Sequence, residues 1–183
     1  MSHAALCLPK LNPKGLIRIK YSTGDTIFHP LHGIGEVKDF EKKELLGTEY
    51  IFAVLFFPRQ QLKISLPANK LDETVRTPLT DQQARDILET AQETSEPLNS
   101  SWKVRNRKNL ERLASGDPVQ LITVLRGLHA IREEKGNLNN SDRKHLTQSL
   151  DLLSDEFSVA FGEPIEETRQ RLEQTALSTV GAA

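Results

Sequence analysis

Cysteine is scarce in this chain of 183 residues, and its scarcity excludes several kinds of site. The single cysteine, Cys7, cannot form an intramolecular disulfide or a cysteine cluster around a metal ion. Long apolar runs are also lacking, because the longest one, 51–57, is far shorter than the about 20 residues of a membrane-spanning helix. The first residues, interrupted by Pro9 and Pro13, do not resemble a signal peptide. These absences predict a cytoplasmic protein in a reducing compartment.

Charge is nearly balanced over the whole chain but unevenly distributed along it. The formal net charge is −1, so no strong overall attraction to an anionic partner is expected. Residues 99–148 nevertheless carry ten cations and five anions, whereas 72–97 and 149–183 each carry seven anions and two cations. Any nucleic-acid contact is therefore expected in the basic block, 99–148.

Residues 21–77 have the pattern of a small β module. Strand-like runs occur in TIFHP, HGIGEVKDFE, YIFAVLFF and QQLKISLP, with a possible short strand around 71–76. In the second run, alternation puts Val37 and Phe40 on opposite faces. Several short strands with turn residues between them predict a small closed or half-closed barrel. Residues 1–20 before it are expected to form a flexible leader.

The rest of the chain has helical periodicity. Thr80 and Gln83 have the spacing of a capping box, which predicts a helix to about residue 92, followed by a polar linker to residue 98. Further helices are expected over 102–114, from Asp117-Pro118 to about 135, after a cap at Ser141, and from about 163 towards 176. The fold class predicted is α+β: a β module (21–77), a connecting helix and linker (78–98), and a compact helical module with an acidic tail (99–183).

The only tryptophan, Trp102, lies in the stretch NSSWKVRNRKNLERLASGD, among polar and basic residues. One interpretation is a hydrophobic staple that folds back onto Leu110 or Leu113. Another is an exposed indole that meets a partner, since an aromatic ring beside cations suits stacking on a base while the cations hold phosphates. The basic run alone would also fit a solvated helix face.

These motifs resemble those of the CarD/CdnL family of bacterial RNA-polymerase-binding transcription regulators. The resemblance covers about 22–160 and rests on GDTIFHPLHGIGEV, LKISLPANKL, SSWKVRNRKNLERLASGD and DPVQLITVLRGLHAIREEKGNLNNSDRKHL. The first motif is shared with transcription-repair coupling factors, whereas the motif around Trp102 is specific. The resemblance implies a Tudor-like (SH3-like) β module that binds the polymerase β subunit, and a helical module that contacts promoter DNA in a nucleoid-associated complex.

The resemblance also implies roles for particular residues. Trp102 would act as a wedge in the minor groove at the upstream edge of the transcription bubble and favour the open complex. The cations after Trp102 would hold backbone phosphates, a contact that does not depend on the base sequence. These cations are Lys103, Arg105, Arg107 and Lys108. Edge-strand pairing with the polymerase would involve Lys43, Lys63, Ile64 and Ser65. Ser65 and Val104 stand where many relatives have arginine.

No catalytic, cofactor or metal site is predicted. His29 and His32 lack a third ligand nearby, and the Gly33-Ile34-Gly35 sequence is not followed by a helix as a phosphate-binding loop would be. The alternative function is a protein-interaction module in which Trp102 is a hot spot for a protein partner, without DNA contact. The oligomeric state is open, because an edge strand can also pair with its own copy.

Overall fold

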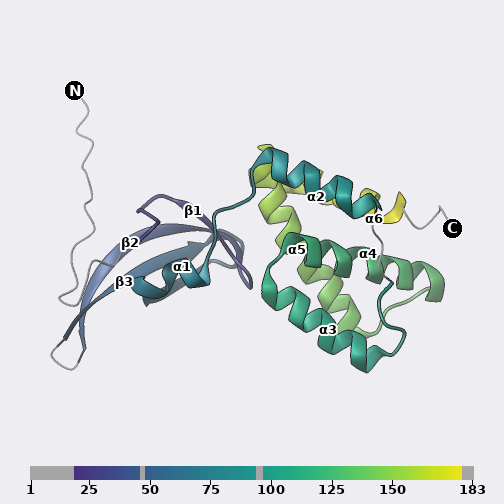
Figure 1. Cartoon of the computed structure of the whole chain (residues 1–183), viewed down its shortest axis with the longest axis horizontal. Helices are drawn as coiled ribbons and strands as arrows, with labels where there is room; N and C mark the ends of the chain where they lie inside the picture. The colour runs from purple at the N-terminus through teal and green to yellow at the C-terminus, as the bar shows by residue number, and fades with distance from the viewer. Residues whose placement is uncertain (1–18, 46–47, 94–96, 179–183) are drawn as a thin grey trace. The chain divides into compact units, whose positions relative to one another are not determined.

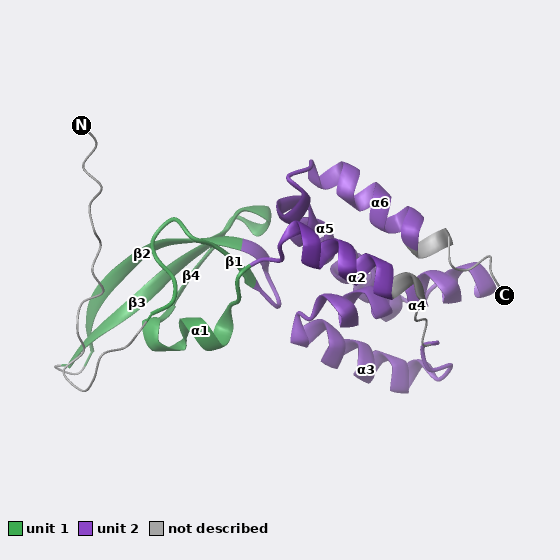
Figure 2. Ribbon diagram, turned by 45° about the horizontal axis from the view of Figure 1, so that its top comes forward, with its two compact units in different colours: residues 1–28, 35–77 green, residues 29–34, 78–183 purple. Residues whose placement is uncertain are grey.

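The computed structural model describes residues 19–45, 48–93 and 97–178 (Figure 1). The chain divides into two compact units (Figure 2). The first contains the described residues up to 28 and residues 35–77, and the second contains 29–34 and the described residues from 78 onward.

The first unit is a curled antiparallel sheet. Its strands are β1 (Thr26–His29), β2 (Gly33–Leu45), β3 (Thr48–Phe57) and β4 (Leu62–Pro67), and they are hydrogen-bonded in that order. A 3-10 turn, Pro58–Gln60, joins β3 to β4, and a second one, Ala68–Lys70, leads into the short helix α1 (Leu71–Thr74). An isolated antiparallel bridge joins Phe28 to Arg76. The half-barrel predicted from the alternating pattern is confirmed.

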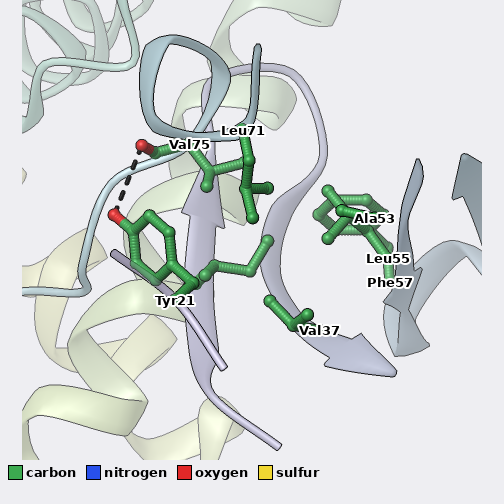
Figure 3. Packing of buried hydrophobic residues seen from close by; sticks show 8 residues of the cluster. Tyr21, Val37, Ala53, Leu55, Phe57, Leu71 and Val75 are labelled. Carbon is green, nitrogen blue, oxygen red and sulfur yellow. Dashed lines mark hydrogen bonds between the residues drawn. The ribbon is translucent and has the colours of Figure 1, made fainter. Parts of the chain in front are cut away.

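One face of β3 forms the core of this unit. Ala53, Leu55 and Phe57 alternate along the strand and are fully buried (Figure 3). Leu71 of α1 joins them, and the hydroxyl of Tyr21 donates to the carbonyl of Val75 at 3.4 Å. The core therefore centres on one face of β3, joined by Ile27 of β1 and Val37 of β2, and is closed by the helical turn α1 and by Tyr21.

Two sequence-based expectations for this unit are wrong. The strand expected around 71–76 is instead α1 followed by its C-cap, Val75. Leu71 and Val75 are four residues apart and face the same core, and only Arg76 is paired as in a sheet. The alternation expected in β2 is broken by a bulge between Val37 and Asp39. Because a bulge inserts one residue, Phe40 packs against the same core as Val37 rather than on the opposite face.

The second unit is a bundle of five helices within the described residues: α2 (Asp81–Glu93), α3 (Trp102–Ser115), α4 (Pro118–Lys135), α5 (Asn140–Phe161) and α6 (Ile165–Ser178). Helices α4 and α5 form its centre, and α2, α3 and α6 each pack against both. Figure 1 shows α4 and α5 between α2 and α3. No helix in the described part of the chain is long and apolar enough to cross a membrane.

Side-chain caps start three of these helices. At α2, the Thr80 N–H donates to Gln83 Oε1 at 2.9 Å and the Gln83 N–H donates to Thr80 Oγ1 at 3.3 Å, which confirms the capping box. At α4, Asp117 accepts from the Gln120 N–H at 2.9 Å, also as expected. Ser141 does not cap α5, because Asn139 takes that position and accepts from the N–H of residue 142.

Gly35 provides a test of packing in the β unit. A Cβ atom at this position would lie 2.6 Å from Cδ1 and Cε1 of the buried Phe57 ring and 3.0 Å from the Phe56 carbonyl oxygen. We expect Gly35→Ala to lower the free energy of unfolding by about 1–3 kcal/mol, as overpacking of a core does. Denaturant unfolding measures the change. The penalty should shrink in a Phe57→Leu background, and an equal penalty in both backgrounds would contradict the assigned clash.

His129 makes the stability of the helical unit sensitive to acid. Burial and, secondarily, the nearby Arg132 guanidinium lower the pKa of His129 to about 4. Arg132 Nη2 lies 2.9 Å from His129 Nδ1, and since arginine can only donate, the imidazole accepts there. The unfolded chain, with a histidine pKa near its usual value, therefore takes up the proton first as the pH falls.

Stability should accordingly decline between about pH 6.5 and 4, by up to about 1.4 kcal/mol per pH unit from this histidine. Urea unfolding of wild type and His129→Gln across that range measures the difference, and the variant should show the shallower dependence. Burial also lowers the pKa of His145, although the nearby Asp142 acts in the opposite direction. The stability of the variant should therefore still decline with falling pH, but less steeply. If the unfolding free energies of wild type and His129→Gln change in parallel with pH, His129 does not contribute to the acid sensitivity.

Candidate functional site

Helix α3 begins at Trp102 after a turn held by side chains. Ser101 is its N-cap, but the Ser101 side chain makes no capping hydrogen bond. Instead the Ser101 N–H donates to Asn99 Oδ1 at 2.9 Å, and the first helical hydrogen bond runs from the Arg105 N–H to the Ser101 carbonyl. At the other end, Gly116 has a φ of 62° and closes the helix. Trp102 thus occupies the first helical position.

The Trp102 side chain is exposed to solvent. Its exposed fraction is 55%, although helical periodicity aligns it with the buried residues Asn109 and Leu113 further along α3. A staple would bury the indole, and Leu110 is itself 51% exposed, so this geometry favours the interpretation in which the indole meets a partner.

Three of the four cations grouped with Trp102 lie on the surface of the same helix. Lys103, Arg107 and Lys108 are exposed, and Lys103 Nζ lies 5.9 Å from the centre of the Trp102 ring. Lys103 and Arg107 are four residues apart and share one helix face. Within the described part of the chain, none of the three forms an ion pair. Their charge is therefore available to a partner.

Arg105 lies apart from these cations. Only 5% of it is exposed, and its guanidinium faces the start of α5. Nε donates to Asp142 Oδ1 at 3.1 Å and Nη2 to Asp142 Oδ2 at 2.6 Å, while Nη1 donates to the carbonyls of Asn99 and Ser100 at 2.7 and 3.2 Å. Every nitrogen of this guanidinium has a partner inside the protein, so Arg105 is not placed to hold phosphates.

Asp142 and Asn139 are the residues that sequence reasoning missed. Asp142 Oδ2 also accepts from Asn139 Nδ2 at 2.6 Å, and the Asp142 N–H donates to Asn139 Oδ1 at 2.9 Å. The three-residue spacing of these two is a helix-start signal that could have identified the cap. The pairing with Arg105 could not be read from the sequence, because it depends on how α3 packs against α5.

The predicted polymerase-binding residues lie on β2 and β4. Lys43 Nζ donates to Ser65 Oγ at 3.2 Å across the intervening strand β3, and it also pairs with Glu41 at 3.1 Å. Lys63 is exposed like Ser65, two residues away on β4, whereas the Ile64 side chain packs against the core. Since β4 is last in the strand order, no described strand covers its outer edge. The structure therefore joins Lys43, Lys63 and Ser65 on one face and places Ile64 on the other.

Other candidate chemistry has no support in the described residues. The rings of His29 and His32 lie with centres 4.7 Å apart, and burial followed by His32 lowers the pKa of His29 to about 4. No group of three potential metal ligands occurs within the described ranges. Gly33 and Gly35 lie at the start of β2, so a strand follows them instead of the helix that a phosphate-binding loop requires. Cys7 lies outside the described residues.

Both units match domains of known proteins. Residues 21–78 match the CarD-like/TRCF RID domain, and residues 86–173 match the CarD C-terminal domain. A candidate transcription factor of Bacillus subtilis (strain 168), YdeB, is 27% identical over 143 residues, which is 78% of this chain and 93% of that protein. The β unit and the bundle are thus matched in the same order by the two domains of one family. With both domains present, the chain belongs to the CarD/CdnL family and is a transcription regulator.

Proposed function

We propose that this regulator binds the β subunit of RNA polymerase through its β unit and stabilises promoter open complexes through Trp102. The observation that carries the proposal is the half-exposed indole at the start of α3, a helix that also presents three exposed cations without ion-pair partners in the described residues. An exposed indole offers a partner a large apolar ring surface. A partly unstacked base step provides such a partner.

The chemistry of the surface around Trp102 suits DNA without sequence specificity. Lys103, Arg107 and Lys108 would contact backbone phosphates, which position a protein but carry no base information. Minor-groove insertion distinguishes base pairs poorly, so the wedge would act at many promoters. Stacking of one aromatic ring is worth about 1–3 kcal/mol, which corresponds to roughly a five- to hundredfold shift of the open-complex equilibrium.

The charge of the bundle also favours contact through α3. Helix α3 carries five cations and one anion, whereas α2 carries four anions and one cation. Since α4 and α5 lie between these two helices in Figure 1, opposite sides of the bundle have opposite charge. DNA would approach the α3 side. The low net charge of the whole chain fits delivery by the polymerase rather than independent DNA binding.

Polymerase binding is assigned to the outer edge of β4. A strand of the polymerase β subunit would add to this edge through main-chain hydrogen bonds, and the exposed side chains of Lys43, Lys63 and Ser65 would contact it. The 3.2 Å hydrogen bond between Lys43 and Ser65 supports this assignment, because it brings a cation next to the edge strand. Ile64 would contribute through its backbone, since its side chain packs on the core.

The lifetime of promoter open complexes tests the wedge. With purified polymerase of the source bacterium, wild-type protein should lengthen the lifetime, and Trp102→Ala should lose most of a roughly five- to hundredfold effect while binding polymerase equally well. Leu110→Ala is the matched control, because Leu110 is the other half-exposed apolar side chain of α3. Equal activity of wild type and Trp102→Ala would exclude the wedge.

Loss of partner binding by Trp102→Ala would instead favour the protein-interaction module. Lys63→Glu separates the two surfaces, because it should weaken binding to the polymerase β subunit and leave the Trp102 surface unchanged. Retention of full polymerase binding by Lys63→Glu would move the docking surface away from β4.

A further inference from the structure

We propose that Arg105 is a positioning residue that fixes the orientation of Trp102. The functional part of this inference rests on the wedge proposed above, whereas its structural part concerns the bundle alone. Arg105 joins the two carbonyls that precede the helix cap to a carboxylate on another helix, so it connects the turn before Trp102 to the body of the bundle.

The contacts of the guanidinium reach the backbone directly before the indole. Nη1 donates to the carbonyl oxygens of Asn99 and Ser100, at 2.7 and 3.2 Å, and the next two residues are the cap and Trp102 itself. The direction of the Cα–Cβ bond of Trp102 follows from the backbone of these residues. Fixing the two carbonyls therefore limits how the first turn of α3 can rotate.

Other features do not hold this turn strongly. The Ser101 side chain makes no capping hydrogen bond, and helix ends without a side-chain cap tend to fray. Trp102 is 55% exposed, so burial holds its side chain only in part. The Asn99 side chain supports the turn locally through the Ser101 N–H. Leu98, directly before the turn, packs against the buried side chains of Val124 and Leu128 on α4. Within the turn itself, the hydrogen bonds of Arg105 are the described ones that connect it to a second helix.

The far end of the connection is itself rigid. Asp142 accepts from Arg105 and from Asn139 Nδ2, and its N–H donates back to the cap of α5. Arg143 Nε donates to the Leu138 carbonyl at 2.9 Å, which closes the same helix start. The side chains of Arg105 and Asp142 are only 5% and 2% exposed, so water does not compete for these hydrogen bonds.

Only arginine can make this set of contacts. Its planar guanidinium presents donors in fixed directions, and here the donors reach four oxygen atoms on two sides of the side chain. A lysine ammonium is a single point with three donors and cannot reach both the carboxylate and the two carbonyls. Arg105→Lys therefore keeps the charge and removes the connection.

Trp102 reports on its own mobility, because it is the only tryptophan in the chain. Time-resolved fluorescence anisotropy of the full-length protein, without polymerase or DNA, separates local motion of the indole from tumbling of the molecule. We expect a larger amplitude of the fast local component in Arg105→Lys, with an unchanged far-ultraviolet circular dichroism spectrum. Arg107→Lys is the matched control, since Arg107 is exposed on the same helix, and it should leave the amplitude unchanged.

Asp142→Asn provides a second variant in case Arg105→Lys does not fold. It retains one acceptor for Arg105 and removes the bidentate pair, so it should also raise the local amplitude. A residue with only a stabilising role would lower the unfolding temperature without changing indole motion at low temperature. Unchanged amplitudes in folded variants would therefore overturn the positioning role.

The open-complex assay connects this inference to function. Wild-type protein should lengthen the open-complex lifetime, and Trp102→Ala should lose most of this lengthening. A folded Arg105→Lys protein that binds polymerase normally should lose part of it. If the wedge proposal itself is wrong, Trp102→Ala will give the same open-complex lifetime as wild type. That result does not depend on the anisotropy of Arg105→Lys, so the two proposals can fail independently. A mobile indole with a full lifetime effect would overturn the functional part of the positioning role.

Discussion

An ion pair almost wholly removed from water joins the start of α3 to the start of α5. Removal of one partner from such a pair costs about 3–5 kcal/mol, because the remaining charge stays buried without compensation. Exposed pairs such as Arg85–Asp81 are screened by water and salt and contribute far less. The placement of α3 on the bundle, and so of every exposed side chain that α3 carries, therefore depends on Arg105 and Asp142 more than on any surface pair described.

Local signals were sufficient for much of the fold. The capping box of Thr80 and Gln83 and the Asp117-Pro118 pair mark helix starts through contacts three residues apart, which a sequence displays directly. The β2 bulge is different, because it depends on pairing with β3, and it moves Phe40 into the core. Residues 71–76 were misassigned for a related reason. Two apolar residues four apart fit one helical turn, but a segment this short has no periodicity that distinguishes a turn from a strand.

The candidate site shows the same division between local and long-range information. The composition around Trp102 leaves a buried staple and an exposed indole both open, and the structure has the exposed indole. The family resemblance groups Arg105 with the surface cations, whereas its side chain is buried. Counting back by fours from the buried Leu113 reaches Asn109 and then Arg105, so helical periodicity did contain the signal that Arg105 faces inward. Lys43 and Ser65 meet only because β2 and β4 both flank β3, and strand register is not visible in the sequence.

Opposite charge on the two sides of the helical unit has a consequence for the ionic atmosphere around it. Two successive helix-to-helix spacings of about 8–10 Å separate α2 from α3. That separation is about twice the Debye length of about 8 Å at physiological ionic strength. Mobile ions therefore shield the α3 side from the acidic α2 side in such a solution, and the two sides behave as independent surfaces. In dilute buffer the shielding length exceeds the width of the bundle, so the α2 anions offset part of the positive potential at Trp102.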